Sequence, residues 1–595
     1  MRERKPETEQ RKWPRRKILG AALAGAGVFF SLLMPGCGIS SGENKPEGGK
    51  PSELQGETEK EAVFPDVVRA RSQMDEINGA LTAQEITDAY RTTYEVFVYS
   101  FADSDGDGIG DLPGLIKKLD YINDGNPETQ EDLACSEIWL MPIFPSPTYH
   151  KYDATDYKAI DEQYGTMQDF DALLSKCHER NVRVILDLAI NHTSTEHPWF
   201  QTAAAYLKEL KEGEQPSKEA CPYVDYYVFS REKKSGYEPL SGADGWYYEA
   251  RFWSGMPDLN LDSEAVRAEI ADVAAFWLDK GVDGFRMDAV TSYYTEDKTA
   301  NIAFLSWFNG MVKEKSSEAY LVCEGWTDQS IYAQYYESGV DSMFDFAFSG
   351  QDGVIASVVK GNRKASLFAE LMAEEEKLYA SYNEAYVNAP FYTNHDMARS
   401  TGYYAYDDGS RTKLAGALNL LMTGNAFVYY GEELGMRGSG KDENKRAPMY
   451  WSAEPNAKYL CAGPPAMDTV KMKFPAFDEQ AADSYSIYHY YRNVIALRNA
   501  FPVIARGKTI PAEAISGDEI CAFWREMPDG SFQKVLIVIN ASGEEKTVEL
   551  KSLGQEADPS AEDFKLSGVL TVSEAEVKLK GTSLTLPAFA VAVLN

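Results

Sequence analysis

The sequence has few cysteines and few basic residues for its length. Only 7 of its 595 residues are cysteine, and they form neither a C-x-x-C pair nor a regular spacing. A disulfide scaffold and a zinc site are therefore poorly supported, and we expect buried thiols. Lysine and arginine number 59 against 92 aspartates and glutamates, a formal net charge of −33. A chain this acidic repels phosphate backbones, so we expect no nucleic-acid partner.

The remaining composition is that of a globular protein. Hydrophobic residues make up 44% and charged residues 25%, which excludes collagen, coiled coil and global disorder. A chain of this length predicts several domains with sizeable cores. The sequence contains 36 tyrosines and 10 tryptophans. Rings with a polar edge suit wet, sugar-like ligands.

One long apolar run lies near the amino terminus. It covers residues 18–34, follows a basic segment at 11–17 and ends shortly before Cys37. The run is at the short limit for a membrane-spanning helix and predicts a signal peptide over 1–36. Gly36 followed by Cys37 resembles a bacterial lipoprotein cleavage site. That likeness implies an exported cell-surface lipoprotein, anchored to the membrane at Cys37 by a flexible tether over 37–80. Ordinary secretion and an uncleaved anchor are the alternatives.

From about residue 90 the chain alternates β-rich runs with amphipathic helical stretches. The strand candidates are residues 94–101, 137–142, 182–187, 282–287, 321–324, 343–346, 386–394 and 426–430. Such alternation predicts an α/β fold, a (β/α)8 TIM barrel, over 81–191 and 258–504. Residues 192–257 are too many for one helix and read as a subdomain inserted after the third strand. A helix should follow, capped by Asp262 and stopped by Gly281.

The pattern changes to alternating strands beyond about residue 505. Candidates are 535–540, 548–550 and 584–594. They predict a C-terminal antiparallel β-sandwich over 505–595.

Polar side chains gather at the ends of four of the predicted barrel strands. Barrel enzymes carry their reactive groups at the carboxyl ends of the strands. These ends hold Asp187, Asn191 and His192; Arg286 and Asp288; Glu324; and His395 and Asp396. A single aspartate there is more often a helix cap, but four such ends together predict one active-site mouth.

These four segments, in this order, resemble the signature regions of the α-amylase family (glycoside hydrolase family 13). A fifth segment, residues 256–260 with the sequence MPDLN, is similar to the form found in the subgroup intermediate between oligo-1,6-glucosidases and neopullulanases. The resemblance spans roughly residues 90–595. With the export signal, it implies a bacterial lipoprotein α-amylase.

The resemblance implies retaining cleavage of α-glucosidic bonds. Asp288 would be the nucleophile, and Glu324 the acid/base, which needs a raised pKa. Asp396 would bind the 2- and 3-hydroxyls of the distorted sugar ring. Arg286 would keep Asp288 ionised and aim it. The further substrate-binding residues would be Asp187, His192 and His395.

The segment after the second strand candidate resembles the H-G-Y-D motif of the family. In it, Tyr152 would stack on the sugar and His150 would bond its 6-hydroxyl, while Lys151 replaces the usual glycine. Exo-acting relatives read closer to D-N-G-Y-D. Tyr149 stands in the place of that first aspartate, which favours endo cleavage.

A glycine-rich loop after the first strand candidate predicts a metal site. Asp103, Asp105, Asp107, Ile109 through its carbonyl, and Asp111 occupy positions 1, 3, 5, 7 and 9 of a calcium-type loop. Position 12 is Gly114, which rejects a helix–loop–helix sensor. The resemblance implies structural Ca2+ here, and a solvated acidic turn is the alternative. The resemblance also implies a calcium ion between the barrel and the insertion, with Asn191 as a ligand. This second metal candidate is weaker, because Thr291 and Ser292 replace the Lys-His pair of many α-amylases.

Three functions remain open from the sequence. The first is an endo-acting α-1,4-glucanase on starch or maltooligosaccharides. The second is an α-glucosidase, oligo-1,6-glucosidase, neopullulanase-like or transglycosylating enzyme with the same residues, since one covalent intermediate serves them all. The third is a non-catalytic glycan-binding homologue, which the presence of all three carboxylates disfavours. The sequence predicts no oligomeric state.

Overall fold

The computed structural model describes residues 64, 69–211, 213–295, 297–553 and 564–595. The predicted signal peptide, Cys37 and most of the tether lie outside the described residues. The chain divides into two units, Met1–Lys60 and Glu61–Asn595, and all that follows concerns the second. Within the described ranges, no helix combines the length and the apolar character needed to cross a membrane.

Seven parallel strands form the central sheet. They pair in the order β10-β1-β2-β3-β7-β8-β9, with bounds β1 Thr92–Val96, β2 Glu137–Leu140, β3 Arg183–Leu188, β7 Gly284–Met287, β8 Tyr320–Cys323, β9 Ser342–Met343 and β10 Ala426–Tyr429. Residues 389–391 close the ring through the parallel bridges Phe344↔Ala389 and Phe391↔Phe427. The predicted (β/α)8 barrel is confirmed.

The seventh strand candidate, 386–394, is wrong as a regular strand. It makes two isolated bridges only. Pro390 lies at its centre and has no N–H to donate, although its carbonyl accepts the Phe427 amide at 2.8 Å. A proline removes a rung from the hydrogen-bond ladder, so this stretch closes the barrel without forming a continuous strand.

Alternate side chains of the strands pack into two separate clusters. The smaller cluster fills the barrel and consists of Trp139, Ile185, Tyr320, Val322, Phe344, Ala389, Phe391 and Phe427. Their neighbours along the strands, such as Leu186 and Leu321, belong to the larger cluster. Successive side chains of a strand point to opposite faces. Burial on both faces explains why these strands read as continuous hydrophobic runs.

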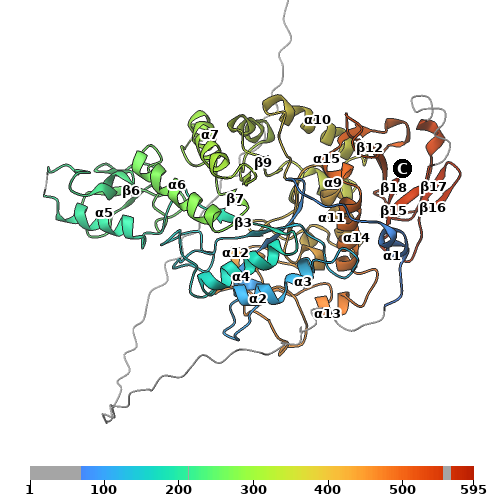
Figure 1. Ribbon diagram of the computed structural model, residues 1–595, viewed down its shortest axis with the longest axis horizontal. Coiled ribbons are helices and arrows are strands. Elements are labelled where there is room, and N and C mark those ends of the chain that lie inside the picture. Colours follow the sequence, from blue (N-terminus) through green and yellow to red (C-terminus); the bar gives the residue numbers. More distant parts are fainter. Residues whose placement is uncertain (1–63, 65–68, 212, 296, 554–563) are drawn as a thin grey trace, which may run out of the picture. The chain divides into compact units, whose positions relative to one another are not determined.

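Helices surround the sheet (Figure 1). The longer ones are α4 Met167–His178, α6 Glu264–Asp279, α7 Lys298–Lys315, α10 Leu367–Tyr382, α11 Ser410–Leu420 and α14 Ile487–Ala500; the shorter are α1 Gln73–Ile77, α2 Leu112–Lys117, α3 Leu119–Ile122, α8 Gln329–Tyr332, α9 Val354–Val359, α12 Asp442–Lys445, α13 Phe477–Gln480 and α15 Val503–Arg506.

The cap predicted at Asp262 is wrong: Ser263 is the N-cap of α6. Its hydroxyl donates to Asp225 Oδ2 at 2.8 Å. Gly281, with φ 99°, ends the helix as expected.

The insertion after β3 forms a small subdomain. It contains α5 Pro198–Glu209 and a three-stranded antiparallel sheet of β4 Phe229–Ser230, β6 Tyr247–Glu249 and β5 Tyr237–Pro239. Its two ends pair with each other through the bridge His192↔Asp258 and through the Thr193 amide, which donates to the Pro257 carbonyl at 3.1 Å. This pairing fixes the subdomain at the carboxyl end of β3.

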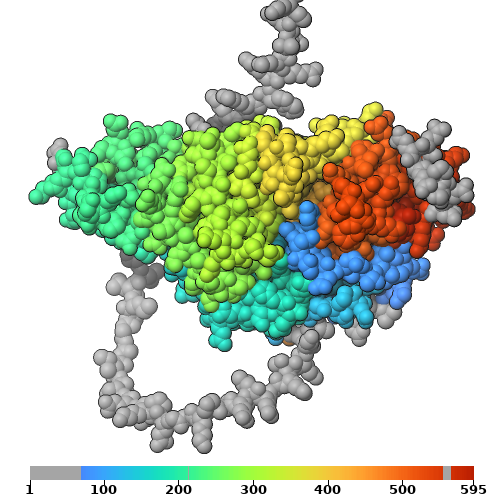
Figure 2. All heavy atoms as spheres, turned by 45° about the horizontal axis from the view of Figure 1, so that its top comes forward, coloured from blue at the N-terminus to red at the C-terminus, as the bar shows by residue number. Residues whose placement is uncertain are grey.

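The C-terminal region is antiparallel β-structure, as predicted. One sheet orders β11-β12-β13-β18-β15 and the other β14-β17-β16, with bounds β11 Lys508–Pro511, β12 Ile520–Glu526, β13 Val535–Asn540, β14 Lys546–Glu549, β15 Leu566–Leu570, β16 Lys578–Lys580, β17 Ser583–Leu586 and β18 Val591–Leu594. The single strand expected at 584–594 is wrong, because the chain changes sheets at Pro587. Figure 2 shows the blue segment lying against the orange and red C-terminal region, and Asn78 Nδ2 donates to the Val569 carbonyl at 2.7 Å.

The six cysteines in the described residues are free thiols. All are buried except Cys461, which is partly exposed. Burial raises the pKa of the Cys177 thiol to about 12, which keeps it protonated and unreactive. The expectation of buried thiols is confirmed for five of these six cysteines.

Candidate active site

The alternation of the strands places the polar residues inside the barrel mouth. In β7, Phe285 and Met287 belong to the outer cluster, so Arg286 and the following Asp288 point inward. In β8, Tyr320 and Val322 lie inside, so two residues later Glu324 does too. The same parity turns Asp187 inward. Residues distant in the sequence therefore meet at one end of the barrel.

Arg286 is the hub of this mouth and is 0% exposed. Its Nη1 donates to Asp187 Oδ1 at 2.8 Å and to Asp288 Oδ1 at 2.8 Å. Its Nη2 lies 3.2 Å from Glu324 Oε2. One guanidinium thus holds three carboxyl groups within a few ångströms of one another, and it favours the ionised form of its hydrogen-bonded partners.

Glu324 is a buried carboxyl group with few hydrogen bonds to offset its burial. Its side chain is 7% exposed. Oε2 accepts the Ala289 amide at 3.3 Å, while Oε1 is buried and has no partner among the described residues. Burial, the largest influence, raises the pKa of Glu324 to about 7, although the Arg286 charge lowers it. This group can hold a proton near neutral pH.

Asp396 has the opposite environment. Oδ1 accepts from Arg446 Nη2 at 2.8 Å, and Oδ2 lies 3.1 Å from His395 Nε2. Burial alone would raise the pKa of Asp396, but these two cations hold it well below its usual range. Its side chain is 33% exposed, so Asp396 is an ionised carboxylate with access to the mouth.

His395 is charged by its acidic neighbours. Its Nδ1 lies 2.6 Å from Glu95 Oε1, and its Nε2 lies 2.8 Å from Tyr152 Oη. Burial alone would lower the pKa of His395, but Asp396 and Glu95 raise it to about 9. The ring is therefore an imidazolium at neutral pH that donates from both nitrogens.

Tyr152 and His150 are placed by the turn after β2. The Tyr152 hydroxyl donates to Asp187 Oδ2 at 2.9 Å, and its ring stacks on His395 with centroids 5.5 Å apart. The Tyr152 amide donates to His150 Nδ1 at 3.2 Å. Burial lowers the pKa of His150 to about 4, so the ring is neutral and its proton is on Nε2.

The remaining predicted residues have supporting positions. Asp187 is 1% exposed. Its oxygens accept hydrogen bonds from Arg286 and Tyr152 and do not face the open mouth. His192 is buried, with Nε2 3.2 Å from the Tyr152 carbonyl, and its ring lies 5.2 Å from that of Phe252. Asn191 Nδ2 donates to Asp258 Oδ1 at 3.2 Å. Within the described residues, no three His, Cys, Asp or Glu side chains gather beside Asn191.

Sequence reasoning missed three contributors to the mouth. Glu95 precedes the signature regions. Its only signal is its place in β1 between Tyr94 and Val96, which belong to the outer cluster, so that its side chain points into the barrel. Arg446 lies in the loop after β10 and donates to Asp396 and, at 3.0 Å, to Tyr149 Oη. Phe252 is the third: its ring lies beside His192 and is 49% exposed. Trp326, two residues after Glu324, stacks on Phe346 and is 54% exposed.

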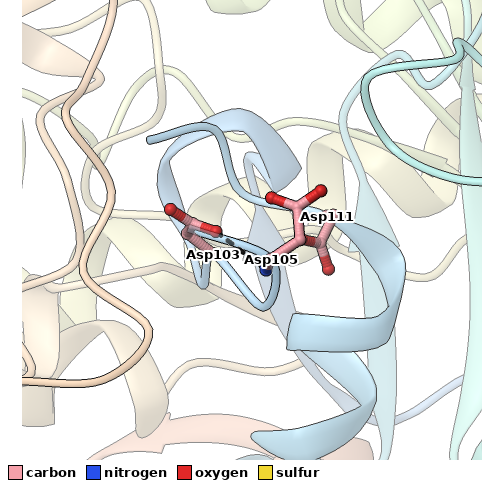
Figure 3. Close-up of side chains that lie close together, drawn as sticks. All are labelled: Asp103, Asp105 and Asp111. Atoms are coloured by element: carbon pink, nitrogen blue, oxygen red, sulfur yellow. Dashed lines mark hydrogen bonds between the residues drawn. The ribbon is translucent and has the colours of Figure 1, made fainter. Parts of the chain in front are cut away.

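The loop after β1 gathers three of the predicted metal ligands (Figure 3). Oxygens of Asp103, Asp105 and Asp111 lie within 4.8 Å of one another. That spread is about twice a calcium–oxygen distance, and an all-oxygen donor set suits a hard cation. Asp107 is not in this group, and its Oδ1 accepts the Ile109 amide at 2.7 Å. The donors fit Ca2+, with Asp107 outside the cluster.

A cavity of about 500 Å³ lies away from this mouth. Its walls include Ile86, Ser136 and Asn181, which precede β1, β2 and β3, so it opens at the amino-terminal face of the barrel. Most of its amides bond to backbone carbonyls, as Asn499 Nδ2 does to Ala134 at 3.0 Å. Catalytic groups of barrels lie at the other face, and we assign this cavity no chemistry.

Residues 95–507 match the family described as alpha amylase, catalytic domain. Alpha-amylase 3 of Dictyoglomus thermophilum is 39% identical over 473 residues, which are 78% of this chain and 87% of the relative. The trehalose-6-phosphate hydrolase of Bacillus subtilis is 28% identical over 576 residues, 82% of this chain and 95% of the relative. The solved structure of Eubacterium rectale Amy13B is 49% identical, has a TM-score of 0.83 and covers 88% of this chain and 98% of its own.

Proposed function

Because the chain belongs to the α-amylase family of glycoside hydrolases, we propose that it cleaves α-1,4-glucosidic bonds of starch and maltooligosaccharides with retention of configuration. The observation that carries this proposal is the pairing of Asp288 with Glu324 on one guanidinium. Retaining glycosidases need two carboxyl groups about 5–5.5 Å apart, one as nucleophile and one as acid. The shared Arg286 brings two carboxyl groups together: Asp288 accepts its hydrogen bond at 2.8 Å, and Glu324 has a pKa raised to about 7.

The two roles follow from the two environments. Asp288 accepts a charge-assisted hydrogen bond from Arg286 and attacks the anomeric carbon, which forms a glycosyl ester. Glu324, protonated because its pKa is about 7, gives its proton to the departing glycosidic oxygen. Glu324 then takes a proton from water, the resulting hydroxide attacks the anomeric carbon, and Asp288 leaves as a carboxylate.

Asp396 and His150 would hold the sugar ring at the point of cleavage, and the buried His395 would act through its contacts with Asp396 and Tyr152. Asp396 is ionised and partly exposed, so it can accept from two adjacent hydroxyls. His150 is neutral with a free Nε2–H. Tyr152 presents a ring for stacking. Interactions that strengthen as the ring flattens towards the transition state would raise kcat.

Endo cleavage is favoured by what stands beside the mouth. Tyr149, rather than an aspartate, lies in the turn after β2 and is bonded to Arg446. The exposed rings of Phe252, beside His192, and of Trp326, two residues after Glu324, offer stacking surfaces. The alternative is an α-glucosidase, oligo-1,6-glucosidase, neopullulanase-like or transglycosylating enzyme that uses the same carboxyl groups, since one covalent intermediate serves them all.

A product time course tests the proposal. The soluble chain from residue 63 onward is incubated with amylose and, separately, with pullulan. Mixed oligosaccharides early in the amylose digest are the expected result. Glucose alone from the start would replace the endo assignment by an exo-glucosidase, and panose from pullulan would indicate a neopullulanase-like enzyme. No cleavage of either would favour a glycan-binding protein.

The pH profile should report the Glu324 proton. A carboxyl group with its pKa raised to about 7 is protonated below that pH and ionised above it. We therefore expect kcat/KM to fall about tenfold per pH unit above about pH 7. α-Maltotriosyl fluoride needs no proton for its leaving group, so its cleavage should lack this alkaline limb. A fall in kcat/KM at the same pH with both substrates would contradict the assignment.

We also propose that Asp103, Asp105 and Asp111 bind a structural Ca2+. A cation bound only by the folded chain stabilises it by mass action. Chelator should lower the Tm by several degrees, and added CaCl2 should restore it. Asp105→Asn should abolish this response, whereas the matched variant Asp107→Asn, outside the cluster, should retain it. An unchanged melting curve with chelator would mean that the loop holds no metal.

The location of the protein is a proposal from the sequence alone. The basic segment, the apolar run and Cys37 support an exported lipoprotein that presents its catalytic unit on a tether at the cell surface. Incorporation of a labelled fatty acid, lost in Cys37→Ser, checks it.

A further inference from the structure

A lysine occupies a backbone conformation that suits glycine, between two residues of the proposed site. Lys151 has φ 63° and separates His150 from Tyr152. In this left-handed region a Cβ atom crowds the backbone, and glycine alone adopts it freely. The local sequence therefore disfavours the turn on which both neighbours depend, so a tertiary interaction must hold it.

The side chain of Lys151 supplies that interaction. It is only 2% exposed, and its Nζ lies 2.8 Å from Asp161 Oδ2. Nζ also donates to Gln163 Oε1 at 2.7 Å and lies 5.5 Å from the centroid of the Tyr164 ring. The ammonium is therefore paired, hydrogen-bonded and covered by an aromatic face, as a buried charge requires.

The acidic partner is itself fixed to the barrel. The Asp161 amide donates to the Ile143 carbonyl at 2.9 Å, close to the end of β2. Asp161 Oδ2 accepts the Ser146 amide at 3.2 Å, and Oδ1 accepts the Gln163 amide at 3.0 Å. Lys151 is thereby tied to a segment that is itself hydrogen-bonded to the residues that follow β2.

We propose that Lys151 is a positioning residue for glycoside cleavage: its buried ion pair with Asp161 holds residues 150–152 in the left-handed turn that aims His150 and Tyr152 at the sugar ring. The inference rests on the proposed function. Tyr152 reaches Asp187 at 2.9 Å and His395 at 2.8 Å from this turn. A relaxed turn would withdraw the stacking ring and the neutral imidazole together.

Two substitutions separate the backbone from the charge. Lys151→Ala and Lys151→Gly both remove the ion pair, but only alanine keeps the Cβ that opposes the turn. We expect kcat/KM on α-maltotriosyl fluoride to fall at least ~10-fold in Lys151→Ala and to stay within ~3-fold of wild type in Lys151→Gly, because glycine needs no anchor. Rates are expressed per folded molecule from the circular dichroism signal.

A matched control is Lys158→Ala. Lys158 pairs with Asp272 on the surface, where their side chains are 39% and 63% exposed, and its loss should leave the rate unchanged. Equal rates in the alanine and glycine variants of Lys151, or a lower Tm with no loss of rate, would overturn the inference. Failure of the wild-type protein to cleave the substrate would instead overturn the proposed function.

Discussion

Asp288→Asn and Glu324→Gln should each lower kcat on amylose at least ~10³-fold, because each removes a group that forms or breaks a bond in the reaction. Both replacements keep the volume of the side chain. Arg286 retains its bonds to Asp187 at 2.8 and 3.0 Å in either variant, so the fold should persist. Activity and Tm measured on the same preparations check this.

The leaving group distinguishes the two variants. Fluoride departs without a proton, so Glu324→Gln should recover much of its first-step rate on α-maltotriosyl fluoride. Asp288→Asn should stay inactive on the same substrate, because no leaving group replaces the nucleophile. Near-normal amylose cleavage by either variant, or rescue of Asp288→Asn by the fluoride, would show that the roles are wrongly assigned.

Arg286→Met should damage both catalysis and stability. Removal of the guanidinium leaves Asp187, Asp288 and Glu324 buried without their shared cation, and breaking a buried pair costs about 3–5 kcal/mol. Asp187 already has a pKa of about 6, raised chiefly by burial. Without Arg286 the carboxyl groups should bind protons more tightly, and a protonated Asp288 is no nucleophile. We expect kcat to fall about 10²- to 10³-fold.

The pH dependence of stability identifies the cause. A carboxyl group whose pKa is raised by folding binds more protons in the folded state, so its contribution favours folding at low pH and is lost as pH rises through the folded pKa. The Tm deficit of Arg286→Met against wild type should therefore grow from about pH 4 to about pH 8. A deficit that is constant over this range would mean that lost packing, rather than uncompensated charge, explains the variant. Arg286→Lys, which keeps the charge, should show a smaller slope.

The sequence foretold the barrel because its strands are buried on both faces. Continuous runs such as 182–187 have few other structures open to them, and the pattern predicted seven of the eight barrel strands, although its first candidate, 94–101, runs past the end of β1 at Val96. It failed at 386–394, where Pro390 interrupts the ladder, and at 584–594, where the chain passes between sheets at Pro587. Both stretches contain a proline. A proline interrupts pairing only where another strand needs its backbone donor, and that depends on which strand lies beside it.

The chemistry divides in the same way. The resemblance carried by short motifs at the strand ends predicted the roles of Asp288, Glu324 and Asp396, since such motifs are written in contiguous residues. The pKa values of Glu324 and Asp396 are set by burial and by contacts between segments distant in the sequence: Arg286 with Glu324, and Arg446 with Asp396. Burial and the nearest charge set a pKa, and both are properties of the assembled barrel. The sequence by itself therefore determined which groups are present. Only the tertiary structure decided that Glu324 can hold a proton near neutral pH. It also decided that the turn at Lys151 adopts a left-handed conformation that the local sequence disfavours.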